Sequence, residues 1–283
     1  MERYCDLHTH STFSDGTCTP GQIVDMAVKM GLGAVALCDH NTVAGLSEFF
    51  AAAQGKAIEA VGGVELSTEY CGRDVHIVGL CVRPEQYSSI TTLVEEMNRC
   101  KQENTRRLVE NLCTAGYDLD YDGICAKNPN GNLNRAHVAA ALVEKGYISS
   151  IKSAFHTLLS EDGGFYTPPK RLAVLDAIAF LHSIGTVTIL AHPFLDFKEA
   201  ELMEFLPQAK DAGLDGMETL YSCFDSAERE AAARIAQKFA LLPSGGSDFH
   251  GGNKPDIVLG RGRGDLFVPK SFLDAIKKRG YIL

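Results

Sequence analysis

The chain has 283 residues, of which 45% are hydrophobic and 22% charged, a composition typical of a globular protein with a sizeable core. Asp plus Glu is 36 against 27 for Lys plus Arg, so the formal net charge is −9, which argues against a protein that wraps duplex DNA. No apolar run reaches the roughly 18 residues of a membrane helix, and the polar N-terminus lacks the apolar core of a secretion signal. We therefore expect a cytoplasmic protein that does not bind membranes.

Short apolar runs alternate with amphipathic helices along most of the chain. The helices are expected to begin at Thr19-Pro20, at Leu172 and at Asp225, where a capping residue or a proline in the first turn favours a start. The candidate strands are rich in Val, Ile and Leu and end near His8, Cys38, Glu65, Leu80, Ala191, Leu220 and Gly245. This alternation predicts an α/β fold with a largely parallel sheet, and the length suits a single α/β barrel.

The stretch 94–166 breaks the alternation. It contains no clear strand, whereas Leu108, Val109 and Leu112 have helical spacing and Lys145-Gly146 marks the end of another helix. We predict a barrel domain formed by residues 1–93 and 167–283. Residues 94–166 would be a helical insertion that caps the active site.

Nine cysteines form an odd count without a C-x-x-C pair. Several lie in apolar runs, such as Cys38 and Cys81. The pattern predicts buried free thiols in a reducing compartment and makes a disulfide framework or a zinc knuckle improbable.

Histidines and carboxylates gather where the candidate strands end. His8 and His10 are two residues apart, so on an extended chain their side chains project to the same side. His76 differs, because it begins its run and fits only if its strand runs against the others or is displaced. The remaining residues of this kind are Asp15, Asp39, His40, Glu65, His192, Glu218, Asp248 and His250. Since the carboxyl ends of barrel strands meet at one rim, we expect these side chains to converge.

Ordinary folding does not require this pattern. A single histidine after a strand is usually a structural or surface residue, but five of the nine histidines lie at strand exits with acids beside them. The sequence therefore predicts a metal site. Mixed imidazole and carboxylate ligands suit Zn, Mn or Fe, and the lack of cysteine in the clusters argues against a structural zinc.

Six motifs carry a family resemblance: DLHTHSTFSDG, CDHNTVAG, GVELS, HIVGL, AHP and GSDFH. They resemble, in the same order, the motifs of the PHP (polymerase and histidinol phosphatase) family. The similarity covers nearly the whole chain and is greatest to bacterial members that act on nucleoside 3′,5′-bisphosphates and as 5′-3′ exonucleases on short RNA. It implies a distorted seven-stranded (β/α)7 barrel and a metal-dependent phosphoesterase whose substrate is a nucleotide or a short RNA.

The resemblance also implies a trinuclear site with two or three divalent cations bound. By analogy, the first cation has His8, His10, Glu65 and Asp248; the second has Glu65, His76 and His192; the third has Asp15, His40 and His250. Some family members have His in place of Asp15, and a carboxylate there favours Mn²⁺ or Mg²⁺ over Zn²⁺. Mn²⁺ is therefore expected first, with Zn²⁺, Fe²⁺ and Mg²⁺ as alternatives.

Further roles follow from the same resemblance. Asp248 or His192 would manage protons as the catalytic residue, and Asp39 would orient a ligand imidazole from the second layer. Glu218 matches a strand-end Glu of close relatives and has no assigned role.

Substrate contacts are expected from four cationic or ionisable side chains. Arg135 and His137 lie in the insertion within a short motif shared with nucleotide-directed relatives, and a guanidinium grips phosphate with two donors. Lys170 and Arg171 could add charge. The alternative is a helix cap for the first pair and a solvated turn for the second.

Two other functions remain open. One is a phosphatase for another small metabolite, such as histidinol phosphate, which would not need Arg135 and His137. The other is a non-catalytic, metal-bound PHP module of a larger assembly. Against that stand the lack of an attached polymerase and a full set of ligand positions.

Overall fold

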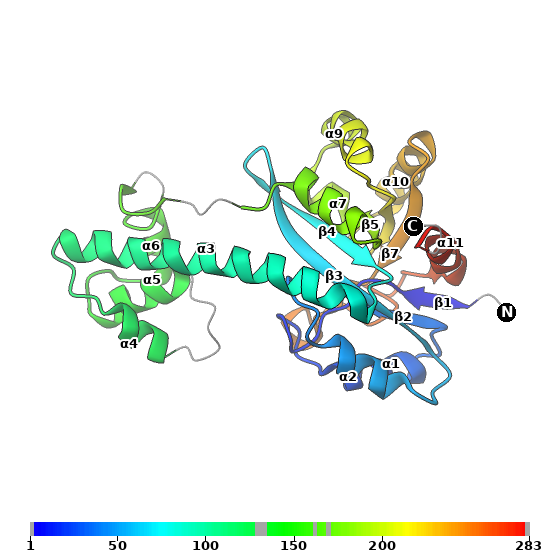
Figure 1. The fold of residues 1–283 in the computed structure, drawn as a ribbon, viewed down its shortest axis with the longest axis horizontal. Coiled ribbons are helices and arrows are strands. Elements are labelled where there is room, and N and C mark those ends of the chain that lie inside the picture. The colour runs from blue at the N-terminus through cyan, green and yellow to red at the C-terminus, as the bar shows by residue number, and fades with distance from the viewer. Residues whose placement is uncertain (1–2, 128–134, 161–162, 168–170, 281–283) are drawn as a thin grey trace. The chain divides into compact units, whose positions relative to one another are not determined.

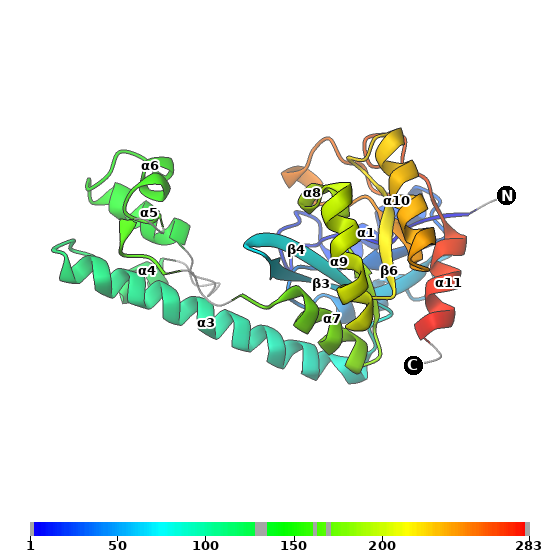
Figure 2. The ribbon, with the colours of Figure 1, turned by 90° about the horizontal axis from the view of Figure 1, so that it is seen from above.

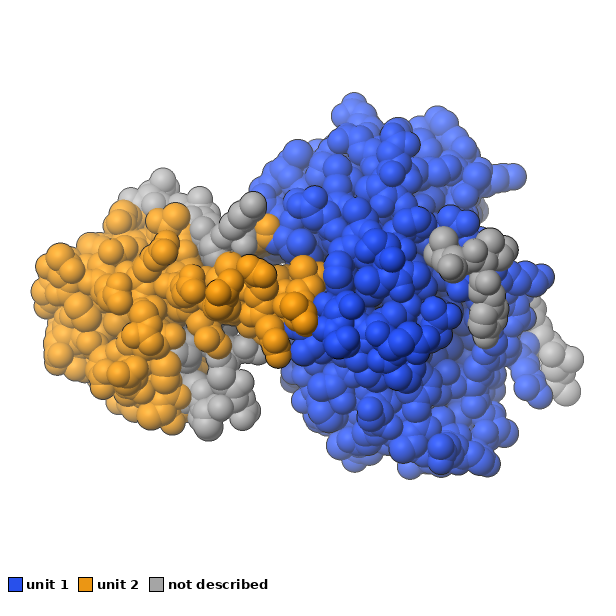
Figure 3. Space-filling model, viewed as in Figure 1, with its two compact units in different colours: residues 1–91, 172–283 blue, residues 92–171 orange. Residues whose placement is uncertain are grey.

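The computed structural model describes residues 3–127, 135–160, 163–167 and 171–280. The chain forms two compact units, one of residues 1–91 with 172–283 and one of residues 92–171, coloured blue and orange in Figure 3. Among the described residues, no helix combines the length and the apolar character needed to cross a bilayer.

The first unit is built on one sheet with the strand order β7-β6-β5-β4-β3-β2-β1-β8 (Figure 1). The strands are β1 (Tyr4–Asp6), β2 (Ala34–Leu37), β3 (Glu59–Tyr70), β4 (Arg73–Leu80), β5 (Val187–Leu190), β6 (Gly216–Tyr221), β7 (Leu242–Gly246) and β8 (Val268–Pro269). The predicted α/β barrel is confirmed, and each of the seven expected strands is present. The strand β8, which has two residues and pairs antiparallel with β1, is not among the strands expected from the sequence.

The sheet nearly closes into a barrel just beyond β1. The amide of Leu7 donates to the carbonyl of Gly245 at 3.2 Å, and the amide of Asp248 donates to the carbonyl of His8 at 2.8 Å. Thr9 and Phe249 then form a parallel bridge. These bonds join the exits of β1 and β7, so residues from the two ends of the chain share one rim.

The strand β4 runs antiparallel to both of its neighbours, β3 and β5. His76, near the start of β4, therefore lies at the end of the sheet where the parallel strands finish, and of the two expected arrangements the reversed strand is the one observed. The expectation that Glu65 ends a strand is wrong. Because β3 and β4 form a long hairpin that turns between Tyr70 and Arg73, β3 continues five residues beyond Glu65.

Helices cover the outside of the sheet in the first unit (Figures 1 and 2). Thr19 and Asp225 cap α1 and α10 as expected, each in a capping box. The helices are α1 (Pro20–Lys29), α2 (Leu46–Ala53), α7 (Val174–Ser183), α8 (Pro193–Asp196), α9 (Glu199–Asp211), α10 (Ser226–Lys238) and α11 (Lys270–Gly280), with 3-10 turns η1 (Pro84–Gln86) and η3 (Gly251–Asn253).

The amino ends of the strands are closed by α11. Its Leu273 and Ile276 are fully buried in the same cluster as Cys5, Val187 and Leu80. Apolar packing therefore seals this end, which leaves the carboxyl ends of the parallel strands for polar side chains.

The regular elements among the described residues of the second unit are helices. Its helices are α3 (Tyr87–Thr114), which begins in the first unit, α4 (Tyr121–Ala126), α5 (Arg135–Glu144) and α6 (Ile151–His156). Leu112, Val138, Leu142 and Ala154 are fully buried in a separate core. The unit thus has a hydrophobic cluster of its own.

The nine cysteines are free thiols. Cys5 and Cys38 are buried as expected, but Cys71, Cys113 and Cys223 are exposed. The prediction of buried thiols therefore holds for only some of them.

Candidate metal centre

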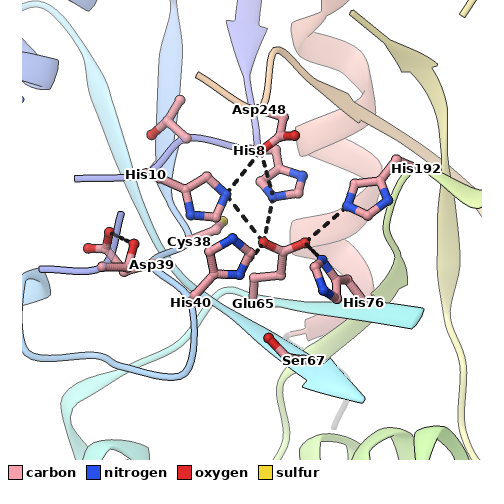
Figure 4. Close-up of polar contacts among 12 residues, drawn as sticks. His8, His10, Cys38, Asp39, His40, Glu65, Ser67, His76, His192 and Asp248 are labelled. Carbon is pink, nitrogen blue, oxygen red and sulfur yellow. Dashed lines mark hydrogen bonds and ion pairs between the residues drawn. The ribbon is translucent and has the colours of Figure 1, made fainter. Parts of the chain in front are cut away.

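Glu65 lies at the centre of a ring of histidines, and its two carboxylate oxygens face different members of it (Figure 4). Its Oε2 lies 3.3 Å from the Nε2 atoms of both His8 and His10 and 2.9 Å from His40 Nδ1. Its Oε1 lies 3.0 Å from His76 Nδ1 and 3.2 Å from His192 Nε2. A carboxylate placed in this way can bridge two cations.

Asp248 faces the same ring from the exit of β7. Its Oδ1 lies 3.2 Å from His10 Nε2, 3.4 Å from His250 Nδ1 and 3.9 Å from His8 Nε2. Its backbone has a φ of 55°, in the left-handed region that non-glycine residues seldom adopt. Such strain is common at functional sites, where the surrounding structure holds it.

Asp15 lies on the solvent side of the ring. Its Oδ1 is 3.2 Å from His250 Nε2 and 3.9 Å from His10 Nδ1, and its Oδ2 is 3.8 Å from His40 Nε2. The four residues offer ligand atoms within 4.8 Å of one another. His10 thus stands between this group and Glu65, a position that the predicted partition of ligands did not give it.

Several buried polar atoms of the ring lack hydrogen-bond partners. Despite their short distances from acids, the geometry is not that of a hydrogen bond for His8 Nε2, either ring nitrogen of His10, His40 Nδ1 or Glu65 Oε2. Buried polar atoms are nearly always paired, because leaving one unpaired costs about 1–3 kcal/mol. A shared cation would satisfy several of these lone pairs together, so the donor set fits divalent metal ions.

The pKa shifts within the ring also favour bound cations. Burial alone would raise the pKa of Glu65 and of Asp248, but His8 and His10 hold both pKa values well below the usual range. Against burial, which lowers it, Asp196 and Glu65 raise the pKa of His192 to about 10. A field that favours a proton on an imidazole also favours a metal cation in its place.

Comparisons with known proteins agree with this geometry. Residues 6–166 match the family model of the PHP domain. A 5′-3′ exoribonuclease from Haemophilus influenzae is 34% identical over 88% of this chain and 91% of its own length. The chain belongs to the PHP domain family. It is a phosphoesterase, a hydrolase of phosphoric ester bonds.

Other PHP relatives differ in their named substrates. A 3′,5′-nucleoside bisphosphate phosphatase from Chromobacterium violaceum is 29% identical, covering 87% of this chain and 86% of its own. A phosphoribosyl 1,2-cyclic phosphate 1,2-diphosphodiesterase from Eggerthella lenta is also 29% identical, over 87% of this chain and 94% of its own length. A crystal structure from Bifidobacterium adolescentis, of a presumed metal-dependent phosphoesterase, has a TM-score of 0.72 with 28% identity and covers 98% and 96%.

Glu218 connects two of the predicted ligands, His8 and His192. Its Oε1 lies 2.9 Å from His8 Nδ1, and its Oε2 accepts from the backbone amide of His192 at 2.7 Å. His192 has a φ of 27°, so this bond also holds a strained backbone. With Nδ1–H donating to Glu218, a neutral His8 keeps the lone pair of Nε2 available for a cation beside Glu65. The expectation that Glu218 ends a strand is wrong, because β6 continues three residues beyond it to Tyr221.

Asp39 has a different set of partners from the one expected. It accepts from the amide and hydroxyl of Ser11, at 2.6 and 2.7 Å, and from the hydroxyl of Ser14 at 2.8 Å. Its described hydrogen bonds therefore hold the loop after β1, which carries His10 and Asp15, and do not go to an imidazole.

The expected substrate-binding residues lie in the second unit. The Arg135 guanidinium stacks 4.1 Å from the Tyr166 ring centroid and donates to the carbonyl of Leu159 at 3.2 Å. His137 is half-buried on α5, and Arg171 is exposed. Lys170 lies outside the described residues. Their roles stay predictions.

Proposed function

We propose that the chain hydrolyses a phosphate ester of a nucleotide, either a nucleoside 3′,5′-bisphosphate or a short oligoribonucleotide, at a centre of two or three divalent cations. The observation that carries the metal centre is Glu65, whose two oxygens are divided between two sets of histidines. Mn²⁺ is the cation we expect first, because two of the three ligand groups contain hard carboxylate oxygens besides Glu65.

We propose the division of ligands that the family resemblance implies. His8, His10, Glu65 and Asp248 would hold one cation; Glu65, His76 and His192 a second; Asp15, His40 and His250 a third. When bound, the ions would supply an activated water and neutralise charge on the phosphoryl group.

Side chains of the protein would then orient the reacting groups and transfer protons. Asp248 is buried, and its pKa lies well below the ordinary value, so the carboxylate stays ionised near neutral pH and can accept a hydrogen bond beside the reacting phosphate. His192 Nδ1 lies 3.6 Å from Asp196, a carboxylate that could fix its ring orientation.

The nucleotide substrate is supported by relatives rather than by the site itself. Two of the named relatives act on nucleotide or RNA phosphates, and both are covered along most of their length. The cyclic phosphate diesterase is the counterexample within the family. A metabolite monoester such as histidinol phosphate and a non-catalytic module are the remaining alternatives.

A panel of substrates with Mn²⁺ tests the proposal. We expect turnover of adenosine 3′,5′-bisphosphate and of a 5′-phosphorylated short RNA, with Glu65→Gln as the inactive control. Turnover confined to histidinol phosphate or to a ribose cyclic phosphate would refute the nucleotide assignment. Bound metal without hydrolysis of any ester would favour the module.

Arg135 is the residue we propose to bind the phosphate that is not cleaved. Its stacking on Tyr166 restrains the guanidinium while leaving donors for an anion. Arg135→Ala should lower kcat/KM for a 3′,5′-bisphosphate about tenfold and leave that for a monophosphate nearly unchanged. Arg106, which stacks on Tyr121 in the same unit, provides the matched control as Arg106→Ala. Equal losses on both substrates would contradict the proposal.

A further inference from the structure

The two side-chain oxygens of Asp248 face different surroundings. Oδ1 faces the histidine ring, with His10 Nε2 at 3.2 Å. Oδ2 accepts two hydrogen bonds, one from the Tyr221 hydroxyl at 2.8 Å and one from Lys254 Nζ at 2.6 Å. Both donors thus contact a different oxygen from the one that lies 3.2 Å from His10 Nε2.

Tyr221 is a rigid donor. It is 3% exposed at the end of β6, and its ring packs against His192 and Phe224, with centroids 5.4 and 5.2 Å away. Its ring therefore has little freedom, and the hydroxyl is directed at Oδ2. A hydrogen bond to an ionised carboxylate is stronger than one between neutral groups.

Lys254 is held by the short segment that precedes it. Within η3, the amide of Gly252 donates to Thr17 Oγ1 and the side-chain amide of Asn253 donates to the carbonyl of Asp15, each at 2.7 Å. The segment thus connects the backbone of Asp15 with the carboxylate of Asp248. The side chain of Lys254 is 40% exposed, so its ammonium group reaches Asp248 from the solvent side.

We propose that Tyr221 and Lys254 are positioning residues for the metal centre. They occupy Oδ2 of Asp248, so that this carboxylate offers Oδ1 alone and binds a cation through one oxygen. The inference rests on the proposed metal centre, and it gives a positioning role to two residues that are not among the expected ligands. Outer partners of this kind fix the direction of a ligand, and losing one typically weakens metal binding or activity about 10–100-fold.

Metal titration separates this role from substrate binding. Tyr221→Phe and Lys254→Met are compared with wild type for Mn²⁺ content and affinity, together with kcat and KM. Tyr70→Phe and Lys56→Met are matched controls, because their partners, Gln208 and Asp25, lie outside the histidine ring. Lys254→Arg keeps a cationic donor and should restore most of the affinity lost in Lys254→Met.

We expect Mn²⁺ to bind about tenfold or more weakly to both test variants and as in wild type to both controls. Unchanged affinity in both test variants, with metal-replete wild type, would overturn the inference and leave the metal centre intact. A higher KM for Lys254→Met without weaker Mn²⁺ binding would also overturn it, since Lys254 would then act on substrate. A wild type that binds no metal would refute the centre itself. Lys254 is partly exposed, so this variant remains informative if Tyr221→Phe folds poorly.

Discussion

The two ends of the barrel treat buried charge in opposite ways. At the amino ends of the strands, Asp215 accepts from Arg279 Nε at 2.7 Å and from the amide of Thr188 at 3.1 Å. At the carboxyl ends, Glu65 is equally buried, yet its Oε2 has no hydrogen-bond partner among the described residues. The paired end contributes to stability, whereas the unpaired end keeps lone pairs for ligands.

This difference indicates where the protein depends on something outside its own chain. Unpaired buried carboxylates and imidazoles are costly unless a cation joins them. Changes at the carboxyl end should therefore act through metal and activity, and changes at the amino end through folding.

Metal removal should have the largest effect on activity and stability, because it leaves the buried acids and imidazoles at the carboxyl end unpaired. Chelation is expected to abolish hydrolysis and to lower the melting temperature by about 5–10 °C, the shift that corresponds to roughly 2.7 kcal/mol of binding at a hundredfold excess over Kd. Calorimetry before and after dialysis, with metal content verified, measures this. An unchanged melting temperature in metal-free protein would show that the ring is satisfied without cations.

The loss on chelation should grow with pH. Acids around His192 raise its pKa to about 10, although burial lowers it. In the metal-free protein, a raised imidazole pKa gives stability that is complete below the unfolded value of 6.5 and is lost as pH rises towards 10. Protons thus replace part of the cation's effect at low pH. A melting shift on chelation that is smaller at pH 8.5 than at pH 6 would contradict this reasoning.

Glu218→Gln should have the second largest effect. The amide can still accept from His192 but cannot stabilise His8 Nδ1–H as a carboxylate does, so the ring orientation of His8 is weakened. We expect a 10–100-fold loss in metal affinity or activity. Glu199→Gln, which alters an exposed ion pair with Arg234, is the control. Wild-type metal affinity in Glu218→Gln would remove this residue from the centre.

The sequence predicts these two ends unequally. The clustering of the histidines and acids could be predicted because parallel strands deliver their exits to one rim, and the position of His76 left a reversed or a displaced strand as the two possibilities, of which the structure has the first. The position of Glu65 inside β3 could not be predicted, because it depends on a hairpin that continues the strand beyond an apparent end. Strand periodicity says which face a residue is on, not how far the pairing runs.

The contacts of Glu218 and Lys254 could not be predicted from the sequence for another reason. Glu218 contacts residues 26 and 210 positions away, and Lys254 contacts Asp248 only because η3 bends back towards the rim. No local pattern records such pairs. The position of His10 has the same origin, since it lies close to both Glu65 and Asp15.

Arg279→Met should affect the paired end alone. Asp215 is 2% exposed at its side chain and would lose its charged donor, although Thr188 would still donate. The free energy of unfolding should fall by about 2 kcal/mol, as for a hydrogen bond to a buried charge. The matched control Arg234→Met removes an exposed pair and should cost less than about 1 kcal/mol. Chemical denaturation measures both, and kcat should not change at 25 °C. Loss of activity without loss of stability would break the division between the two ends.

The smallest effect is expected at Glu59, also at the amino end, where Lys270 lies 2.9 Å away and Lys277 is a second partner. Burial raises the pKa of Glu59, but hydrogen bonds from Lys277 and Lys270 hold it below its ordinary 4.5. A depressed carboxyl pKa gives stability that is present above the ordinary value and is lost as pH falls through the folded value. Glu59→Gln should therefore cost under about 1 kcal/mol at pH 7. Denaturation curves of variant and wild type should converge at low pH, below the pKa that Glu59 has in the folded protein. If the difference instead persisted there, packing rather than charge would account for it, and pairing would not explain the stability of this end.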